Sequence, residues 1–341
     1  MKMTFNDIFI DNTKKGRKIL KENYHSRGKI PIIDQGKNQI SGFSDEKVGI
    51  YKEIPVIIFG DHTRIIKYVD YPFLLGADGV KILSIKTNKF ITKYLYYALL
   101  NYYIPDTGYN RHFKWLKNFT VNVNSINEQK RIVVTLDKII TMIDKKKKQI
   151  NLLEELVKSR FIEMFGDPIK NDKGWEVKKW EEVLKIINGK NQKKVENESG
   201  KYDIFGSGGK MGKADDWLVK ENSVLIGRKG SINKPIIVKE KIWNVDTVFG
   251  LEPNIEIINC DYLYYFCYFY DFERLNKAVT IPSLTKKDLL KIDIPIPPLV
   301  LQEKFVLIHK SINKLKFEAE KSLKEMENLY ESLMQKFFKQ N

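Results

Sequence analysis

Two long stretches of the chain place apolar residues at alternating intervals of three and four, with polar residues between them. In residues 125–165 the apolar positions are Leu136, Ile139, Ile143, Ile150, Leu153, Val157 and Met164, and Lys146 and Arg160 interrupt the series. In residues 298–341 they are Phe305, Ile308, Ile312, Leu315, Ala319, Met326, Leu329 and Leu333. This spacing is typical of a coiled-coil seam. The sequence therefore predicts two long helices that bury their seams against each other.

The ends of these helices carry capping signals. Ser125, with Glu128 three residues later, has the pattern of a capping box at the start of the first helix. Gly166, followed by Pro168, is typical of a helix end. A proline-rich stretch, 295–298, separates the second helix from the segment before it.

Residues 1–124 and 166–297 show a different pattern of short β-rich apolar runs, glycine turns and a tyrosine-rich helix. Each segment repeats the tyrosines of this helix, which are Tyr94, Tyr96, Tyr97, Tyr262, Tyr264 and Tyr265. Because they recur at helical spacing, we expect them to pack in the cores and not to stack on bases.

The chain repeats itself at an offset of about 170 residues. "GKIPIIDQG" at 28–36 parallels "GKYDIFGSG" at 200–208, and "PVIIFGDHTR" at 55–64 parallels "SVLIGRKGS" at 223–231. Further matches place Asp78 beside Asp246, "YLYYAL" beside "YLYYFC", and Gln129 beside Gln302. Five matches in the same order indicate two copies of one unit.

We therefore predict a mixed α/β protein with a pseudo-twofold internal repeat. Its globular domains are residues 1–124 and 166–297, and its long helices are 125–165 and 298–341. An antiparallel coiled coil of these helices would hold the two domains apart.

Composition favours a nucleic-acid partner. Of the 341 residues, 43% are hydrophobic, which is enough for folded domains. The net charge of +16 favours a polyanionic ligand. A membrane surface is the alternative, but no apolar run reaches ~18 residues and no signal peptide opens the sequence. We expect a cytoplasmic protein, with Cys260 and Cys267 as buried, reduced thiols.

Motifs for catalysis are absent from the sequence. It has no Gly-x-Ser-x-Gly, no His-Glu-x-x-His and no Asn/Asp-Pro-Pro-aromatic signature, and its four histidines lack metal-ligand spacing. We therefore predict no catalytic residue, no metal and no cofactor bound by this chain.

"IFGSGGKMGK" at 204–213 looks like a phosphate loop, but its spacing is wrong for a nucleotide. Three residues, and not four, separate Gly208 from Gly212, and Lys213 is followed by Ala214 where a P-loop has Ser or Thr. The segment is then either a plain glycine turn or a loop whose backbone and lysines meet the phosphates of DNA. On the second interpretation its contact residues are Ser207, Gly208, Lys210 and Lys213.

The chain resembles type I restriction-modification specificity subunits, the HsdS family, over essentially its whole length, and its second half is the clearer copy of their target-recognition domain. The residues that carry the resemblance are "GKYDIFGSGGKMGKADDWLVKENSVLIGRKGSINKPIIVKEKIWNVDTVFGL" and "IPSLTKKDLLKIDIPIPPLVLQEKFV". The first half departs from the pattern, with "IIDQG" for "IFGSGG" and "FGDHTR" for "IGRKGS". Such divergence fits two domains that read different sequences.

The resemblance implies a non-catalytic subunit that reads double-stranded DNA. Each globular domain would read one half of a split target, and the helices would dock two methyltransferase subunits. S-adenosylmethionine is expected on those partners, which methylate adenine. A motor-nuclease, or restriction, subunit can join such a complex.

"IGRKGSINK" holds the best candidates for reading bases. Arg228 can donate two hydrogen bonds to guanine O6 and N7, or it can form a structural ion pair with Asp246. Its neighbours Lys229 and Lys234 suit phosphates, and Ser231 and Asn233 could reach base edges.

In the first half, candidates lie at the corresponding positions. They are His62, Thr63 and Arg64, and the cluster Tyr109, Asn110, Arg111, His112 and Lys114. The residues that align with this cluster are Thr280, Ser283, Lys286 and Lys287. The alternative for each cluster is a solvated loop.

The sequence is compatible with further alternatives. The lysines 145–148 form either a solvated helix face or a surface over the DNA between the half-sites. The chain could instead be the specificity module of a type II-like methyltransferase system. It could also be a coiled-coil scaffold that binds acidic partners without reading sequence.

Overall fold

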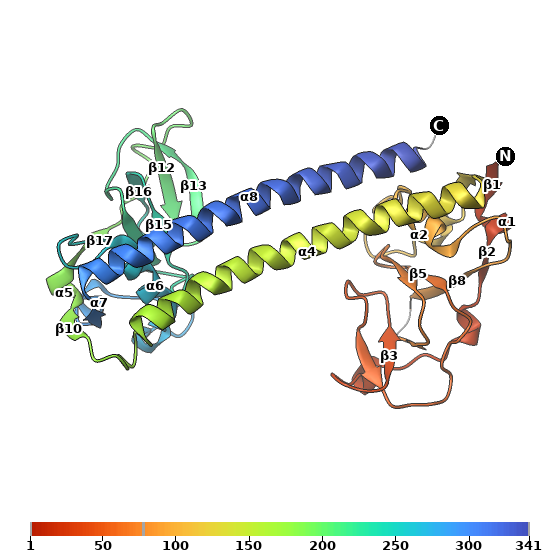
Figure 1. Ribbon diagram of the computed structural model, residues 1–341, viewed down its shortest axis with the longest axis horizontal. Coiled ribbons are helices and arrows are strands. Elements are labelled where there is room, and N and C mark those ends of the chain that lie inside the picture. The colour runs from red at the N-terminus through yellow and green to blue at the C-terminus, as the bar shows by residue number, and fades with distance from the viewer. Residues whose placement is uncertain (1, 77–78, 340–341) are drawn as a thin grey trace. The chain divides into compact units, whose positions relative to one another are not determined.

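The computed structural model describes residues 2–76 and 79–339, so Asp78 lies outside the described residues. The chain divides into two compact units. Unit 1 comprises Met1–Lys147 and Lys321–Asn341, and unit 2 comprises Lys148–Glu320. Each unit therefore takes part of both long helices, α4 (Ile126–Phe165) and α8 (Leu299–Phe338) (Figure 1).

Unit 1 is built from short strands around one helix, α2. In chain order its elements before α4 are β1 (Lys2–Thr4), α1 (Phe5–Ile8), β2 (Phe9–Asp11), 3₁₀ turns at Thr13–Lys15 and Lys21–Asn23, β3 (Ile30–Ile33), β4 (Gly42–Ser44), β5 (Val56–Gly60), β6 (Ile66–Val69), β7 (Leu74–Leu75), β8 (Val80–Ile85), α2 (Thr92–Leu100), α3 (Phe113–Leu116) and β9 (Thr120–Asn122). Its sheets have the orders β1-β9, β2-β8-β5-β6 and β4-β3-β7.

Unit 2 repeats this order of elements. They are β10 (Glu176–Lys179), α5 (Trp180–Val183), β11 (Leu184–Asn188), β12 (Tyr202–Gly206), β13 (Gly209–Ala214), β14 (Ser223–Gly227), β15 (Ile236–Val238), β16 (Ile242–Asn244), β17 (Val248–Pro253), α6 (Cys260–Phe269), a 3₁₀ turn at Phe272–Leu275, α7 (Lys286–Leu289) and β18 (Asp293–Ile296). The sheet orders are β10-β18, β11-β17-β14-β15 and β13-β12-β16. The same topology in both units confirms the predicted internal repeat and the mixed α/β class.

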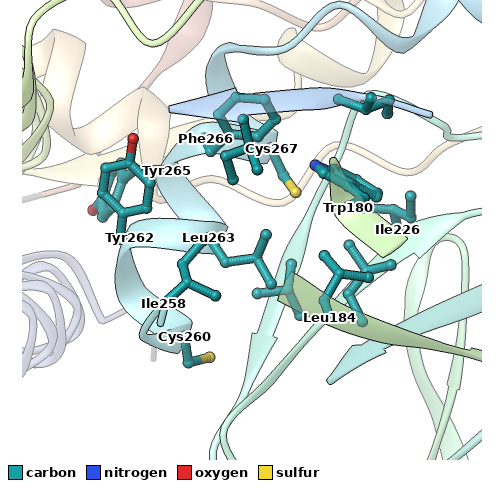
Figure 2. Packing of buried hydrophobic residues seen from close by; sticks show 14 of the residues in the cluster. Trp180, Leu184, Ile226, Ile258, Cys260, Tyr262, Leu263, Tyr265, Phe266 and Cys267 are labelled. Carbon is teal, nitrogen blue, oxygen red and sulfur yellow. The ribbon is translucent and has the colours of Figure 1, made fainter. Parts of the chain in front are cut away.

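The tyrosine-rich helices pack in the cores, as the sequence predicts. Tyr94 and Tyr97 of α2, and Tyr262 and Tyr265 of α6, are buried. Figure 2 shows the core of unit 2, where Phe266 of α6 lies 6.2 Å, ring to ring, from Trp180 of α5. The same core holds Cys260 and Cys267 as free thiols, and burial raises the pKa of Cys260 to about 12.

The long helices are antiparallel within each unit. In unit 1, the beginning of α4 shares a core with the end of α8, through Leu136 and Phe338. In unit 2, the end of α4 shares a core with the beginning of α8, through Phe161 and Phe305. The packing of α4 with α8 confirms the predicted helix pair.

Two positions of the predicted seam are wrong. Leu315 is 54% exposed and Leu329 is 50% exposed, whereas Tyr330 packs against the core of unit 1. A straight α-helix turns by ~20° per heptad relative to a repeat of 3.5 residues. The buried face therefore moves around α8 along its length and leaves these leucines outside.

The ends of α4 are capped. The Glu128 amide donates to the Ser125 hydroxyl over 3.2 Å, and Gly166 adopts a φ of +77° after the last turn. A Cβ at Gly166 would lie 1.9 Å from the Asp172 carboxylate, so both conformation and space require glycine there.

One buried amide anchors the first turn of each long helix. In unit 1, Gln129 accepts from the Ile91 amide at 2.9 Å and donates to the Lys89 carbonyl at 2.8 Å. In unit 2, Gln302 accepts from the Asn259 amide at 2.9 Å and donates to the Pro297 carbonyl at 2.8 Å. Gln129 and Gln302, which match in the sequence repeat, therefore have the same structural role.

None of the helices within residues 2–76 and 79–339 has both the length and the apolar character needed to cross a bilayer.

Candidate DNA interface

The candidate loops of both units start from the same main-chain frame. Strand β5 ends at Gly60 and strand β14 at Gly227, and the next residues are Asp61 and Arg228. The Asp61 amide donates to the Gly79 carbonyl at 2.6 Å, and the Arg228 amide donates to the Thr247 carbonyl at 2.7 Å.

A second pair of hydrogen bonds completes this frame. The carbonyl of Asp61 accepts from the His112 amide at 2.8 Å, and that of Arg228 accepts from the Leu284 amide at 2.9 Å. In each unit the loop after β5 or β14 is therefore fixed to the segment that precedes α3 or α7. We call residues 61–65 loop A and residues 228–235 loop B.

Glycine is required where each loop leaves its strand. A Cβ at Gly227 would lie 2.4 Å from the Ser231 carbonyl oxygen. A Cβ at Gly60 would lie 2.2 Å from the Thr63 hydroxyl and 2.8 Å from the Gln35 side chain. Both loops therefore turn back tightly onto their own strand.

Arg228 projects from this frame on the surface of unit 2. Its guanidinium carbon lies 5.8 Å from the centre of the Phe249 ring, and one nitrogen reaches the Asp246 carbonyl oxygen at 3.5 Å. The contact with Asp246 thus involves the main chain and not the carboxylate. A guanidinium has five N–H donors, so this environment orients the group and leaves it able to bind an acceptor.

The hairpin β12–β13 carries the two candidate lysines beside an aspartate. Lys210 lies 2.9 Å and Lys213 lies 3.2 Å from the carboxylate of Asp203. Partial burial raises the pKa of Asp203, but the hydrogen bonds from both lysines hold this pKa below its ordinary value. Asp203 is therefore charged and keeps the lysines together on one strand face.

The tip of this hairpin adjoins loop B. Gly230 has a φ of +81°, and its Cβ position lies 3.5 Å from the Ser207 hydroxyl. Gly208 is exposed, and a Cβ there would meet nothing within 4 Å, so space does not demand a glycine at the tip.

The segment before α7 also contacts loop B. Lys229 forms a β-bridge with Ser283, and the Gly230 amide donates to the Pro282 carbonyl at 3.0 Å. Thr280 is exposed on this segment, as are Lys229 and Lys234 on loop B, and Ser231 is half-buried. The structure therefore brings together the three candidate segments of unit 2.

Asn233 differs from its neighbours in loop B because both ends of its amide bind the protein. Its nitrogen donates to Asp271 at 3.0 Å, and its oxygen accepts from the Phe272 amide at 2.8 Å. This exposed side chain therefore anchors the loop, and its amide has a second N–H donor besides the one that binds Asp271.

Loop A presents a different set of side chains. The rings of His62 and Tyr109 stack with centroids 4.8 Å apart, and Tyr109 is 88% exposed. The Thr63 hydroxyl donates to the Gln35 carbonyl at 2.7 Å. Arg64 has a φ of +61° and pairs with the Asp106 carboxylate at 2.6 Å.

His112 cannot contact DNA in this structure. Its side chain is 0% exposed, and its ring bonds the Asp61 carbonyl oxygen at 3.0 Å and the Thr107 hydroxyl at 3.3 Å. The sequence prediction for this residue is corrected, since the ring holds the segment before α3 against loop A. Its neighbours Tyr109, Asn110, Arg111 and Lys114 are exposed.

Gln35, which is not among the residues predicted from the sequence, contacts loop A at His62 and Thr63. Its side-chain oxygen accepts from the His62 amide at 3.2 Å. The available signal was the repeat itself, because "IIDQG" aligned with "IFGSG" places Gln35 at the position of Ser207.

The lysine run of α4 takes part in the helix pair. Lys147 forms an ion pair with Glu327 of α8 at 2.9 Å, whereas Lys145 and Lys148 are exposed. Exposed ion pairs of this kind contribute little stability. Lys145 and Lys148 are thus accessible to solvent or to a ligand, and both interpretations of the run stay predictions.

Two α/β units of one topology, each with a constant frame under different loops, define a duplicated recognition protein. The chain belongs to the family described as "Type I restriction modification DNA specificity domain", whose model matches residues 1–155 and 172–328.

Curated relatives carry the corresponding names. The specificity subunit of the type I restriction enzyme EcoR124I/EcoR124II from Escherichia coli is 30% identical over 131 residues, which cover 36% of this chain and only 32% of that protein. The putative type I restriction enzyme MjaX specificity subunit from Methanocaldococcus jannaschii is 24% identical over 302 residues, which cover 75% of this chain and 71% of that protein.

Solved structures share the fold. The S subunit of a type I restriction-modification system from M. genitalium superimposes with a TM-score of 0.69 at 20% identity, over 100% of this chain and 96% of that one. A chain from a structure on the complex assembly and conformational transition of the type I R-M system has a TM-score of 0.59 at 16% identity, over 99% of this chain and 97% of that one.

Proposed function

We propose that this chain is the DNA specificity subunit of a type I restriction-modification complex and that it reads a split DNA target without catalysing a reaction itself. In this proposal residues 1–124 and 166–297 are the target-recognition domains, and 125–165 and 298–341 are the spacer helices. The observation that carries the proposal is the frame under loops A and B, which keeps its hydrogen bonds while its side chains change.

Unit 2 would read its half-site with a guanidinium. Arg228 is oriented by Phe249 and by the Asp246 carbonyl, which suits a two-pronged contact with guanine. Lys229, Lys234, Lys210 and Lys213 would meet phosphates, and Ser207, Gly208, Ser231, Thr280 and Ser283 lie on the same three segments.

Unit 1 would read its half-site with a different chemistry. The exposed Tyr109, stacked on His62, offers an aromatic surface to a base or to a thymine methyl group. Thr63, Arg64, Asn110, Arg111 and Lys114 surround this pair or lie on the same segments.

The partners would be double-stranded DNA, two methyltransferase subunits and, where restriction occurs, a motor-nuclease subunit. S-adenosylmethionine would be bound by the methyltransferase. Exposed apolar side chains on the long helices, among them Leu152, Leu307 and Phe317, support a docking role for these helices.

The test compares methylated adenines in cells that express the methyltransferase of this system with and without the chain. We expect methylation at one split motif only when the chain is present. In addition, calorimetry should detect no binding of S-adenosylmethionine to the isolated chain.

Two results would count against the proposal. Tight binding of S-adenosylmethionine to the chain alone would contradict a non-catalytic role. DNA binding that unrelated DNA competes away equally well would indicate a scaffold for acidic partners that does not read sequence.

A further inference from the structure

A lysine is buried inside unit 1. Lys67 of β6 is 3% exposed, and its ammonium donates to the carbonyl oxygens of Asp34 at 2.7 Å and of Asn38 at 2.6 Å. The Asp34 carboxylate lies 3.8 Å from it. Burial lowers the pKa of Lys67 and the Asp34 charge opposes this shift. An ammonium removed from water in this way is unfavourable unless its donors are used.

The fold does not require this lysine. Lys67 pairs with Ile58 across β5 and β6, and the equivalent pair in unit 2 is Leu225 with Ile236. Ile236 packs against a small apolar cluster of its unit. The buried charge is therefore particular to unit 1.

Lys67 fastens the loop between β3 and β4 to the edge of the sheet. The same loop is tied a second time where the Gln39 side chain donates to the Tyr68 carbonyl at 2.8 Å. Within the loop, the Asp34 carboxylate accepts from the Gly36 amide at 2.7 Å and also from the Ser41 hydroxyl. Residues 34–41 are thus held in one conformation.

This loop carries Gln35, which supports loop A from below. Gln35 accepts the His62 amide through its side chain and the Thr63 hydroxyl through its carbonyl. It lies between two glycines, since Cβ atoms at Gly60 and Gly79 would each approach it to 2.8 Å. A displacement of Gln35 would therefore move the main chain at His62 and the side chain of Thr63.

We propose that Lys67 and Gln35 are positioning residues that set the sequence preference of unit 1 without touching DNA. Lys67 holds the loop 34–41, and Gln35 transmits that position to His62 and Thr63. The inference rests on the proposed function, because it concerns the half-site that unit 1 reads.

The experiment uses the full chain, co-expressed with the methyltransferase of its system, and sequences the methylated adenines. The variants are Q35M and K67M, which keep side-chain length and remove the polar groups. K52M is the matched control, because it removes a lysine charge from an exposed position outside loop A. The block whose preference changes in R228A is assigned to unit 2, and the other block to unit 1.

We expect Q35M and K67M each to lower the preference for the correct base in the unit 1 block by roughly five-fold, as for one lost hydrogen bond. The unit 2 block and the K52M control should keep the wild-type preference. Because both residues act through one loop, the double variant should lose little more than the stronger single variant. Q35E, which keeps an acceptor for the His62 amide, should retain more preference than Q35M.

A merely structural role would lower methylation at both blocks together, since a less stable chain forms less complex with either half-site. Equal loss at both blocks, or an unchanged unit 1 block in Q35M, would overturn the inference. If K67M does not fold, Q35M and Q35E decide the question. A wild-type chain that directs no split motif would instead overturn the proposed function itself.

Discussion

Loops A and B occupy the same frame but begin with opposite charges. Asp61 of loop A is 5% exposed and its carboxylate accepts from the Phe113 amide at 2.7 Å. Arg228 of loop B is half-buried and extends over Phe249. The same position therefore serves the fold in unit 1 and faces the surface in unit 2. Main-chain hydrogen bonds fix where a loop lies, and this leaves its side chains free to diverge.

A second comparison concerns the residue before the repeated tyrosines. In unit 1 this residue is Lys93, which pairs with Asp137 of α4 at 2.8 Å. In unit 2 it is Asp261, whose carboxylate contacts His309 of α8 at 2.8 Å and Lys239 at 2.9 Å. The acid lies on the long helix in unit 1 and on the short helix in unit 2.

The largest effect is expected for G227A, which attacks the frame itself. Because the added Cβ would lie 2.4 Å from a main-chain oxygen, loop B must shift. We expect the free energy of unfolding to fall by about 1–3 kcal/mol, as for other overpacked sites. Chemical denaturation measures this, with G208A as the control, since its Cβ would meet nothing within 4 Å. Equal stability of the two variants would mean that the frame tolerates a side chain.

R228A tests base recognition in unit 2 and leaves the main-chain hydrogen bonds of the frame in place. We expect the preference for the unit 2 half-site to fall by roughly 1–3 kcal/mol if the contact with guanine is two-pronged. Stability and the unit 1 half-site should stay unchanged. Sequencing of methylated adenines measures both blocks, and an unaltered unit 2 motif would refute the assignment.

D61A is the counterpart of R228A in unit 1 and should behave differently. Removing the buried carboxylate leaves the Phe113 amide without its acceptor, which we expect to destabilise the fold by about 1–3 kcal/mol. Denaturation curves of D61A and R228A, measured side by side, check this contrast. A lower free energy of unfolding for R228A than for D61A would contradict the prediction.

K213A should have a smaller and less selective effect. A lysine that meets a phosphate contributes equally to all sequences, so affinity should fall for target and non-target DNA alike. The slope of log affinity against log salt should become shallower by about one unit. Binding titrations at several salt concentrations measure it, and a sequence-dependent loss would place Lys213 at a base edge.

D261N should lower the free energy of unfolding near neutral pH, and this difference from the wild type should disappear in acid. Burial raises the pKa of Asp261, but hydrogen bonds from His309 and Lys239 hold it below the ordinary value. A depressed pKa stabilises the fold above the unfolded pKa, and this contribution is lost as pH falls through the folded value. The free energy of unfolding should therefore fall less steeply below about pH 4 in D261N than in the wild type. Parallel curves for the two chains would contradict the prediction.

The periodic and repeated features of this protein were determined by the sequence alone. A seam of three and four residues over 40 positions specifies a long helix, and Ser125 and Gly166 mark its ends. Matching motifs in the two halves reveal the duplication, because every copy of a motif carries the same local signal. The net charge of +16 also indicated a polyanionic partner, because net charge depends only on composition.

Only the tertiary structure decided which loop residues face outward. His112 and Arg111 are neighbours in one polar cluster, yet the first is buried and the second is exposed. The Asn233 side chain forms hydrogen bonds with Asp271 and with the Phe272 amide, which are distant in the sequence. Loops have no period, so the direction of each side chain depends on partners that are distant in sequence. Gln35 and Lys67 became visible for that reason only once the chain was folded.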